Sequence, residues 1–426
     1  MRVALINPGW SFEGSIYFGC RHPHLVTEFG TARPLLERDG HDVLLLDAHM
    51  FGLSHSDIRA ELAAFRPDIT VITTAPTYLF WRCAQPELRV CQELVSAIRD
   101  LSPMIVAVGP HGSSTPRTAL RKLGVDMVLM GECEEPLCEL AAGVEEVAGS
   151  CLRQDGEIVV RGGPRASRFV DTPPLVWPDE MVRRHRHHHH RFDAAPDAPG
   201  AEVEASRGCP YNCSFCAKEH FRDAYRRRPV DTVLREIDGL VRQGVDYVYF
   251  IDEIFLPNAE LLKGLAERDV RFGVQTRIDL WKPDMIRELG RAGCVSIEAG
   301  VESLTEEGRA ALNKKCRLTT DELAERLFVA GECVPFVQAN LIETPDDDEE
   351  TVAAWRTRMR DAGIWANDPV PMFPYPSSPA YRSLWGECDD HAWERAVDYY
   401  LENFGTMSDL QDEQPRPLKE LEAAAP

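Results

Sequence analysis

The sequence lacks a long hydrophobic run, and none of its 426 positions begins a stretch of about 18 consecutive apolar residues. A helix that spans a bilayer needs roughly that many apolar residues in a row. The opening segment, Met1-Arg2-Val3 and onwards, also lacks the layout of a secretory signal peptide. We therefore expect a cytoplasmic protein that is not inserted into a membrane.

Positive charge is scarce. The chain has 47 Lys and Arg against 69 Asp and Glu, which gives a formal net charge of −22. An electric field of this sign does not attract a nucleic-acid backbone or an anionic lipid surface. We expect a small-molecule substrate and no nucleic-acid partner.

A disulfide framework is not expected, although the chain has 13 cysteines. The number is odd, and disulfides do not persist in the reducing cytoplasm. The cysteines are better explained as metal ligands together with small residues of the core.

Short apolar runs alternate with helix-length segments over the first third of the chain. The runs cover residues 3–8, 42–47, 68–73, 104–109 and 126–131, and segments such as 56–65 and 85–101 lie between them. Near-continuous apolar strands separated by helices indicate a buried parallel sheet. We predict an open, doubly wound α/β domain over residues 1–145, with ligands beyond the carboxyl ends of its strands.

Residues 146–200 differ in composition and contain Pro173-Pro174 and a basic, histidine-rich run over residues 183–191. We predict a linker with some short structure. The histidine run could bind a metal ion, and a solvated low-complexity stretch is the alternative.

Alternation of strands and helices resumes over residues 201–385. The expected strands end near Ser206, Asp252, Thr276, Gly300, Thr344 and Phe373. Such units suit a partial (β/α)6 barrel of the TIM type, whose active site lies at the carboxyl ends of the strands. Residues 386–426 are predicted to form a C-terminal helical extension that becomes a loose acidic tail after about Met407.

Three cysteines stand directly after the first expected barrel strand, namely Cys209, Cys213 and Cys216 in S-R-G-C-P-Y-N-C-S-F-C. Thiolates bind iron–sulfur clusters, and a tight loop lets three of them reach one cluster. Three ligands on a four-iron cluster leave one iron open to a small molecule. A zinc site with His220 as the fourth ligand is the alternative that the spacing leaves open.

The cysteine spacing of three residues and then two, with the aromatic Phe215 before the last cysteine, resembles the radical S-adenosylmethionine (SAM) superfamily. The resemblance implies that a 4Fe–4S cluster is chelated by the amine and carboxylate of SAM. It also implies that reduction of the cluster cleaves SAM to a 5′-deoxyadenosyl radical. An external electron donor such as flavodoxin or ferredoxin would supply the electron.

Polar residues at the later strand ends resemble the positions at which this family contacts SAM. The resemblance makes Asp252 or Glu253 the partner of the methionine ammonium and Asn340 the candidate for a ribose contact. The full set of implied SAM contacts is Phe215, Asp252, Glu253, Gln275, Arg277, Glu302 and Asn340.

Two glycine-rich loops follow expected strands of the first domain, at residues 109–116 and 131–136. Together with the cysteine motif, they resemble the cobalamin-binding subgroup of the radical SAM enzymes. The resemblance implies a cobalamin-binding type of first domain, with the corrin ring facing the mouth of a radical SAM barrel. The implied cobalamin contacts are Pro8, Thr74, Gly109, Pro110, His111, Gly112, Gly131 and Glu132.

A D-x-H-x-x-G motif supplies a cobalt ligand in cobalamin mutases and methionine synthase, and these residue types occur here at Asp47-Ala48-His49-Met50-Phe51-Gly52. Because many members of the resembled subgroup lack this histidine ligand, we expect cobalamin without a protein histidine ligand, and a domain that has lost the cofactor is the alternative. The aromatic cluster of Tyr78, Phe80 and Trp81 either contacts the corrin or packs in the core.

These observations lead to methylation of an unactivated carbon of a small molecule as the leading hypothesis. Radical cyclisation or rearrangement without methyl transfer is the alternative within the same subgroup. A non-catalytic metal-binding interaction module is the alternative from another class. No residue pattern identifies the substrate.

Overall fold

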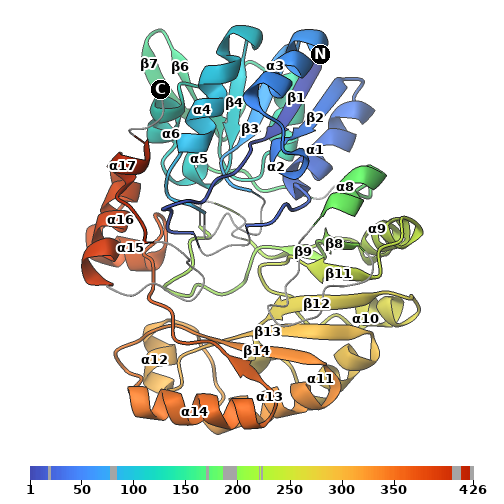
Figure 1. Cartoon of the computed structure of the whole chain (residues 1–426), viewed down its shortest axis with the longest axis vertical. Coiled ribbons are helices and arrows are strands. Elements are labelled where there is room, and N and C mark those ends of the chain that lie inside the picture. The colour runs from blue at the N-terminus through green and yellow to red at the C-terminus, as the bar shows by residue number, and fades with distance from the viewer. Residues whose placement is uncertain are drawn as a thin grey trace.

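Two main sheets form the two halves of the molecule (Figure 1). The computed structural model describes residues 1–17, 21–76, 84–168, 172–185, 199–219, 221, 224–404 and 414–422. Within these residues, no helix is both long enough and apolar enough to cross a membrane.

The first sheet has the strand order β2-β1-β3-β4-β5-β6-β7. Strands β1 to β5 are parallel to one another, whereas β6 runs antiparallel to both β5 and β7. The strand bounds are Arg2–Asn7 (β1), Asp42–Asp47 (β2), Ile69–Thr73 (β3), Ile105–Val108 (β4), Met127–Leu129 (β5), Ser150–Gln154 (β6) and Glu157–Arg161 (β7).

Helices cover both faces of this sheet, because its central strands are apolar on both sides. In β1, Ala4 and Ile6 belong to one core and Val3 and Leu5 to the other, since successive side chains of a strand point to opposite faces. The helices that pack on the first core are α3 (His55–Phe65), α4 (Arg89–Ile98) and α6 (Pro116–Leu123). Those on the second core are α1 (Thr27–Arg38) and α7 (Glu134–Ala141). The predicted doubly wound fold is confirmed.

The first sheet continues past residue 145, where the sequence pattern predicted a linker. Strands β6 and β7 form an antiparallel hairpin that extends the sheet beyond β5. Arg165 also forms a β-bridge with Gly131. The segment pairs with the sheet because its apolar residues Cys151 and Val160 pack in the first core. We therefore propose a boundary of the first domain beyond residue 165.

The second sheet is an open barrel in which neighbouring strands are parallel and follow the order of the chain. Its strands are Gly200–Val203 (β8), Tyr247–Phe250 (β11), Arg271–Thr276 (β12), Cys294–Glu302 (β13), Phe336–Leu341 (β14) and Trp365–Ala366 (β15). This arrangement confirms the predicted partial barrel of the (β/α)6 type. The last strand ends at Ala366, earlier than the predicted end near Phe373, and Val370 adds only an isolated bridge to Ile342.

An outer layer of helices packs on the barrel sheet and buries a large apolar core. These helices are α9 (Val230–Arg242), α10 (Ala259–Ala266), α11 (Pro283–Arg291), α13 (Thr320–Cys333) and α14 (Glu349–Asp361). The remaining helices of the two halves are α2 (Ala48–Phe51), α5 (Pro110–Ser114), α8 (Asp179–Arg184) and α12 (Glu306–Ala311), with short 3-10 turns at Arg99–Leu101 and Ile278–Leu280.

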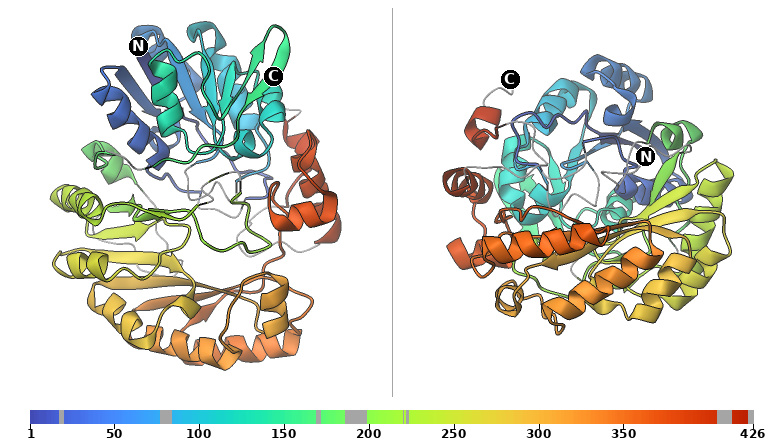
Figure 2. Two further views of the ribbon diagram at one scale, coloured as in Figure 1. Left: turned by 180° about the vertical axis from the view of Figure 1, so that it is seen from behind. Right: turned by 60° about the horizontal axis from the view of Figure 1, so that its bottom comes forward.

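The carboxyl ends of the parallel strands in the first sheet face the barrel (Figures 1 and 2). The N-terminus lies at the outer edge of the first sheet, and β1 runs from there towards the middle of the molecule. The ligand-binding edge of a doubly wound sheet therefore faces the second half of the molecule.

The C-terminal helices connect the two halves along one side (Figure 1). They are α15 (Pro379–Trp385), α16 (Ala392–Asn403) and α17 (Leu418–Glu422). Lys122 Nζ in α6 lies 2.6 Å from Glu394 Oε1 and 2.8 Å from Glu422 Oε2. The expectation of a loose tail after Met407 is wrong for α17, because Leu418 and Leu421 are buried against the rest of the chain.

Gly109 ends β4 at the turn into α5 and occupies a backbone region with a φ of 137° that only glycine adopts readily. A Cβ atom at this position would lie 2.1 Å from Thr74 Oγ1. The turn between β4 and α5 therefore requires glycine for packing inside the protein.

We expect the substitution Gly109→Ala to lower the free energy of unfolding by about 1–3 kcal/mol, because it adds backbone strain and a steric clash. Urea denaturation of the cofactor-free protein would measure this change. Gly163→Ala is the matched control, since no atom lies within 4 Å of a Cβ atom there. Equal stability of the two variants would contradict this account of the turn.

Candidate functional site

The three cysteines of the motif lie on a loop that is held at both ends. The loop starts after β9 (Ser206–Arg207) and returns at β10 (Arg226–Arg227), which pairs with β9 in antiparallel fashion. Gly208 N donates to Glu253 Oε2 at 2.7 Å, and Lys218 Nζ donates to the carbonyl oxygen of Cys209 at 2.8 Å. The loop is thereby fixed to the barrel strand ends.

Cys209, Cys213 and Cys216 line one cavity of about 200 Å³ at the carboxyl ends of the barrel strands. Its lining also includes six of the sequence-predicted SAM contacts: Phe215, Glu253, Gln275, Arg277, Glu302 and Asn340. The structure thus brings together residues that are spread over more than a hundred positions of the sequence. A parallel barrel does this because all its strands end at the same rim.

Asp252 does not line the cavity, although it is next to Glu253. Its carboxylate accepts a hydrogen bond from Ala205 N at 2.8 Å and a shorter one from the Ser206 hydroxyl. Asp252 therefore fixes the segment between β8 and β9, and Glu253 is the residue of this pair that faces the cavity.

Lys314 also lines the cavity and was missed by the sequence analysis. Its Nζ lies 3.0 Å from Glu302 Oε1, and only 1% of its side chain is exposed. It follows α12 rather than a barrel strand, so the pattern of polar strand ends gave no signal for it.

Two cations, Arg277 and Lys314, line the cavity beside the thiols. The Arg277 guanidinium lies 4.0 Å from the centre of the Tyr211 ring and pairs with Asp279 at 2.8 Å. Burial raises the pKa of the Cys213 thiol to about 11, whereas the nearby Lys314 and Arg277 lower it. A bound metal replaces the proton of a thiol, and the two cations favour the resulting thiolate.

The predicted cobalamin contacts lie at the edge of the first sheet that faces the barrel. Pro8 follows β1, Thr74 follows β3, and the remaining residues follow β4 and β5. Thr74 Oγ1 and the side-chain amide of Gln85 are buried without a hydrogen-bond partner among the described residues. Buried polar atoms normally have partners, so these groups fit a polar ligand such as cobalamin.

The glycines of these loops make close contacts within the protein itself. A Cβ atom at Gly112 would lie 2.3 Å from Val128 Cγ1, and one at Gly131 would lie 2.2 Å from the carbonyl oxygen of Arg165. Pro110 lines a small void with Ser113, distinct from the cysteine cavity. The need for glycine at 112 and 131 therefore comes from chain packing.

His111 is buried under a C-terminal helix. Its ring stacks on Trp393 of α16 with 4.4 Å between ring centroids, and its Nε2 lies 3.2 Å from the carbonyl oxygen of Pro86. Burial lowers the pKa of His111 to about 4, so the imidazole is neutral at pH 7. This contact with the C-terminal extension had no signal in the sequence.

Glu132 pairs with arginines that flank the cysteine loop. Arg207 Nη1 lies 3.0 Å from Glu132 Oε2 and also contacts Glu134, and Arg207 Nη2 lies 2.9 Å from Glu204 Oε2. Arg226 contacts the same Glu132 carboxylate. The Arg207 side chain and its three carboxylate partners are each at most 1% exposed. We call these residues the Arg207 network; it joins the loop after β5 to the start of the cysteine loop.

Several residues singled out in the sequence lie outside the described residues. They are His220, the cluster of Tyr78, Phe80 and Trp81, and the histidine run beyond His185.

The fold and the cavity together define a class: an α/β protein whose partial barrel carries a three-thiol loop opposite a second ligand-binding sheet. The model of the Radical SAM superfamily matches residues 203–352, and the model of the B12 binding domain matches residues 33–141. The chain therefore belongs to the radical SAM superfamily, in its subgroup with a B12 binding domain. Its cofactors are a 4Fe–4S cluster, SAM and cobalamin.

Similar proteins support this family. The anaerobic magnesium-protoporphyrin IX monomethyl ester cyclase of Cereibacter sphaeroides is 26% identical over 95% of this chain and 66% of its own length. The hopanoid C-3 methylase of Methylococcus capsulatus is 27% identical over 79% of this chain and 65% of its own length. The chain thus spans slightly less than two thirds of the length of these two relatives.

A solved structure shares the fold. The radical SAM methyltransferase TsrM from Kitasatospora setae, solved with cobalamin and a 4Fe–4S cluster bound, superposes with a TM-score of 0.70 at 19% identity. The match covers 89% of this chain and 76% of that chain.

We expect Arg207→Met to lower the free energy of unfolding by about 3–5 kcal/mol, because it leaves three carboxylates buried without their shared cation. Urea denaturation would measure the change. Arg271→Met is the matched control, since Arg271 and Asp246 form a pair that is 54% and 39% exposed. The control should change stability by less than about 1 kcal/mol. A loss no larger than that of the control would show that the Arg207 network does not stabilise the protein.

Proposed function

We propose that this protein is a cobalamin-dependent radical SAM enzyme that methylates an unactivated carbon of a small molecule. The observation that carries the proposal is the single cavity in which three thiols meet polar strand ends, at the side of the barrel that faces the B12 binding domain. Both cofactor domains would then act on one substrate held between them.

When bound, the cluster and SAM supply a 5′-deoxyadenosyl radical, and cobalamin supplies a methyl group. The chain's own residues hold and orient these groups. Cys209, Cys213 and Cys216 would hold the cluster by three of its irons, since a loop of this length offers three thiolates to one face.

The charged residues of the cavity suit the zwitterionic end of SAM. Glu253 and Glu302 would accept hydrogen bonds from the methionine ammonium, whereas Lys314 and Arg277 would pair with its carboxylate. Asn340 offers an amide for the ribose hydroxyls, as the family resemblance implies. Phe215 contributes an apolar wall that excludes water from the reacting atoms.

Radical cyclisation is the second candidate function. The observation that favours it is the match to the anaerobic cyclase of Cereibacter sphaeroides, which extends over 95% of this chain. The hopanoid methylase and TsrM are methyl-transferring relatives, and the first proposal rests on them. A reduced flavodoxin or ferredoxin in the cytoplasm would serve as electron donor in both cases.

We expect the protein, reconstituted anaerobically with iron, sulfide and hydroxocobalamin, to convert SAM into 5′-deoxyadenosine and S-adenosylhomocysteine when dithionite is added. The variant with Cys209→Ala, Cys213→Ala and Cys216→Ala should lose its iron and form no 5′-deoxyadenosine. Iron analysis and chromatography of the products provide the measurement, with Cys333→Ala as the control for loss of an unrelated half-buried thiol.

The products separate the two functions. Methyl transfer yields both nucleosides, whereas cyclisation without methyl transfer yields 5′-deoxyadenosine alone. Deoxyadenosine formation by the triple variant would overturn the radical SAM proposal itself.

The neighbours Asp252 and Glu253 should differ in their roles. We expect Glu253→Gln to weaken SAM binding by about 10- to 100-fold, because a hydrogen bond between charged groups is lost. Asp252→Asn should instead lower the melting temperature and leave the affinity of the folded protein within about threefold, since the Asp252 carboxylate is bonded to Ala205 N and the Ser206 hydroxyl and does not line the cavity. Anaerobic calorimetric titration with SAM and thermal melts would test both statements, and the reverse pattern would refute the assignment.

A further inference from the structure

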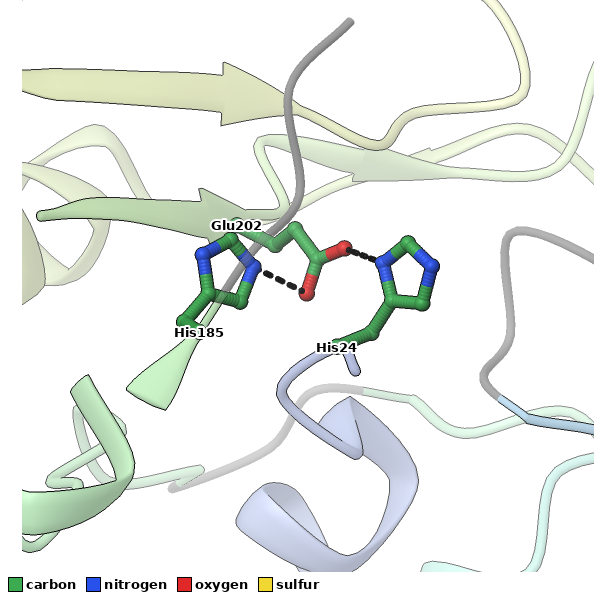
Figure 3. Close-up of side chains that lie close together, drawn as sticks. All are labelled: His24, His185 and Glu202. Carbon is green, nitrogen blue, oxygen red and sulfur yellow. Dashed lines mark hydrogen bonds and ion pairs between the residues drawn. The ribbon is translucent and has the colours of Figure 1, made fainter. Parts of the chain in front are cut away.

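Two histidines and one glutamate from distant parts of the sequence meet at the junction of the two halves (Figure 3). His24 precedes α1 in the first domain, His185 directly follows α8, and Glu202 lies in β8, the first strand of the barrel. Figure 3 shows the two imidazole rings on either side of the Glu202 carboxylate. We call these three residues the His–His–Glu cluster.

The cluster is shielded from solvent and closely spaced. The side chains of His24 and His185 are each 1% exposed, and that of Glu202 is 0% exposed. His24 Nδ1 lies 2.6 Å from Glu202 Oε1, and His185 Nε2 lies 3.4 Å from Glu202 Oε2. One ligand atom from each residue lies within 4.8 Å of the other two.

The set of donor atoms matches the coordination chemistry of borderline divalent metals. Zn²⁺ binds imidazole nitrogen and carboxylate oxygen at about 2.0–2.2 Å, so adjacent ligand atoms lie roughly 3.0–3.5 Å apart. The distance between His185 Nε2 and Glu202 Oε2 is already in that range. His24 Nδ1 and Glu202 Oε1 would need to separate by less than about 1 Å, which a small rotation of the glutamate provides.

The charge of the cluster also favours a cation. A buried carboxylate is costly unless a positive group compensates it, and a divalent ion bound by the carboxylate and both imidazoles would supply that compensation. Leu25 N donates to Glu202 Oε2 at 3.0 Å, and this bond orients the carboxylate as the second-sphere contacts of a metal ligand do.

We propose that His24 Nδ1, His185 Nε2 and the Glu202 carboxylate bind one divalent transition-metal ion, Zn²⁺ or Fe²⁺, that ties the B12 binding domain to the first strand of the barrel. Glu202 stands seven positions before Cys209 in the sequence. The ion would therefore hold the strand that leads into the cysteine loop. The site is separate from the cysteine cavity, whose lining contains none of these three residues.

The test needs a full-length background without the other strong metal ligands. In this background the three motif cysteines are replaced by alanine, and His187, His188, His189 and His190 are replaced by asparagine. After treatment with a chelator, the protein is titrated with Co²⁺ or Zn²⁺, and binding is followed by the visible absorption of Co²⁺ and by elemental analysis. We expect a single equivalent per chain and a rise in melting temperature with Zn²⁺. Elemental analysis of the untreated protein distinguishes Zn²⁺ from Fe²⁺.

Two variants of this background separate a metal site from a hydrogen-bonded cluster. His24→Asn keeps an N–H donor near Glu202 but removes the imidazole ligand, and Glu202→Gln removes the anionic ligand. We expect each to weaken binding by more than about 100-fold, whereas His55→Asn, at an exposed histidine of α3, should not change it. Circular dichroism tests whether each variant is folded. If Glu202→Gln does not fold, the result for His24→Asn decides between the two interpretations.

The proposal is overturned if the background retains no equivalent of metal, or if His24→Asn binds as tightly as the background does. Either result would assign the three residues to a hydrogen-bonded cluster without a metal. Because the motif cysteines are absent in every variant, these outcomes do not depend on the proposed radical SAM activity.

Discussion

The buried guanidinium of Arg207 is the contact on which the arrangement of the two halves depends. Its carboxylate partners come from the loop after β5, from α7 and from the barrel, and all are removed from water. A charge in such surroundings is tolerated only when its partners are in place. The first motif cysteine, Cys209, stands two residues after Arg207. The same ion pairs therefore dock the B12 binding domain and position the cysteine loop.

The sequence predicts most of the architecture because the decisive signals are local. Apolar runs of strand length marked both sheets, and the order of strands in a parallel barrel follows the order in the chain. For this reason the sequence alone was enough to assign polar residues at successive strand ends, such as Glu253, Gln275 and Asn340, to one cavity. Helix α3, for which the sequence pattern predicted residues 56–65, spans His55–Phe65 and shows how closely the alternation of apolar runs and helix-length segments places an element.

The features that escaped prediction depend on contacts that are distant in sequence or on the direction of a side chain. Asp252 and Glu253 are neighbours with the same chemistry, and only the turn after β11 decides which one faces the cavity. Lys314 reaches the cavity from a segment with no strand. The hairpin of β6 and β7 lies at the edge of the first sheet, where the strands are partly exposed to solvent and carry glycine and polar residues. This composition resembles that of a linker.

The contacts of Lys122 with Glu394 and Glu422 span 272 and 300 positions of the sequence. During synthesis, the parallel strands of the first sheet have left the ribosome long before these two glutamates are made. The lysine must therefore stay hydrated until nearly the whole barrel has emerged. Closure of the α6 surface by the C-terminal helices is consequently a late step in the maturation of the chain, after the cysteine loop has been translated.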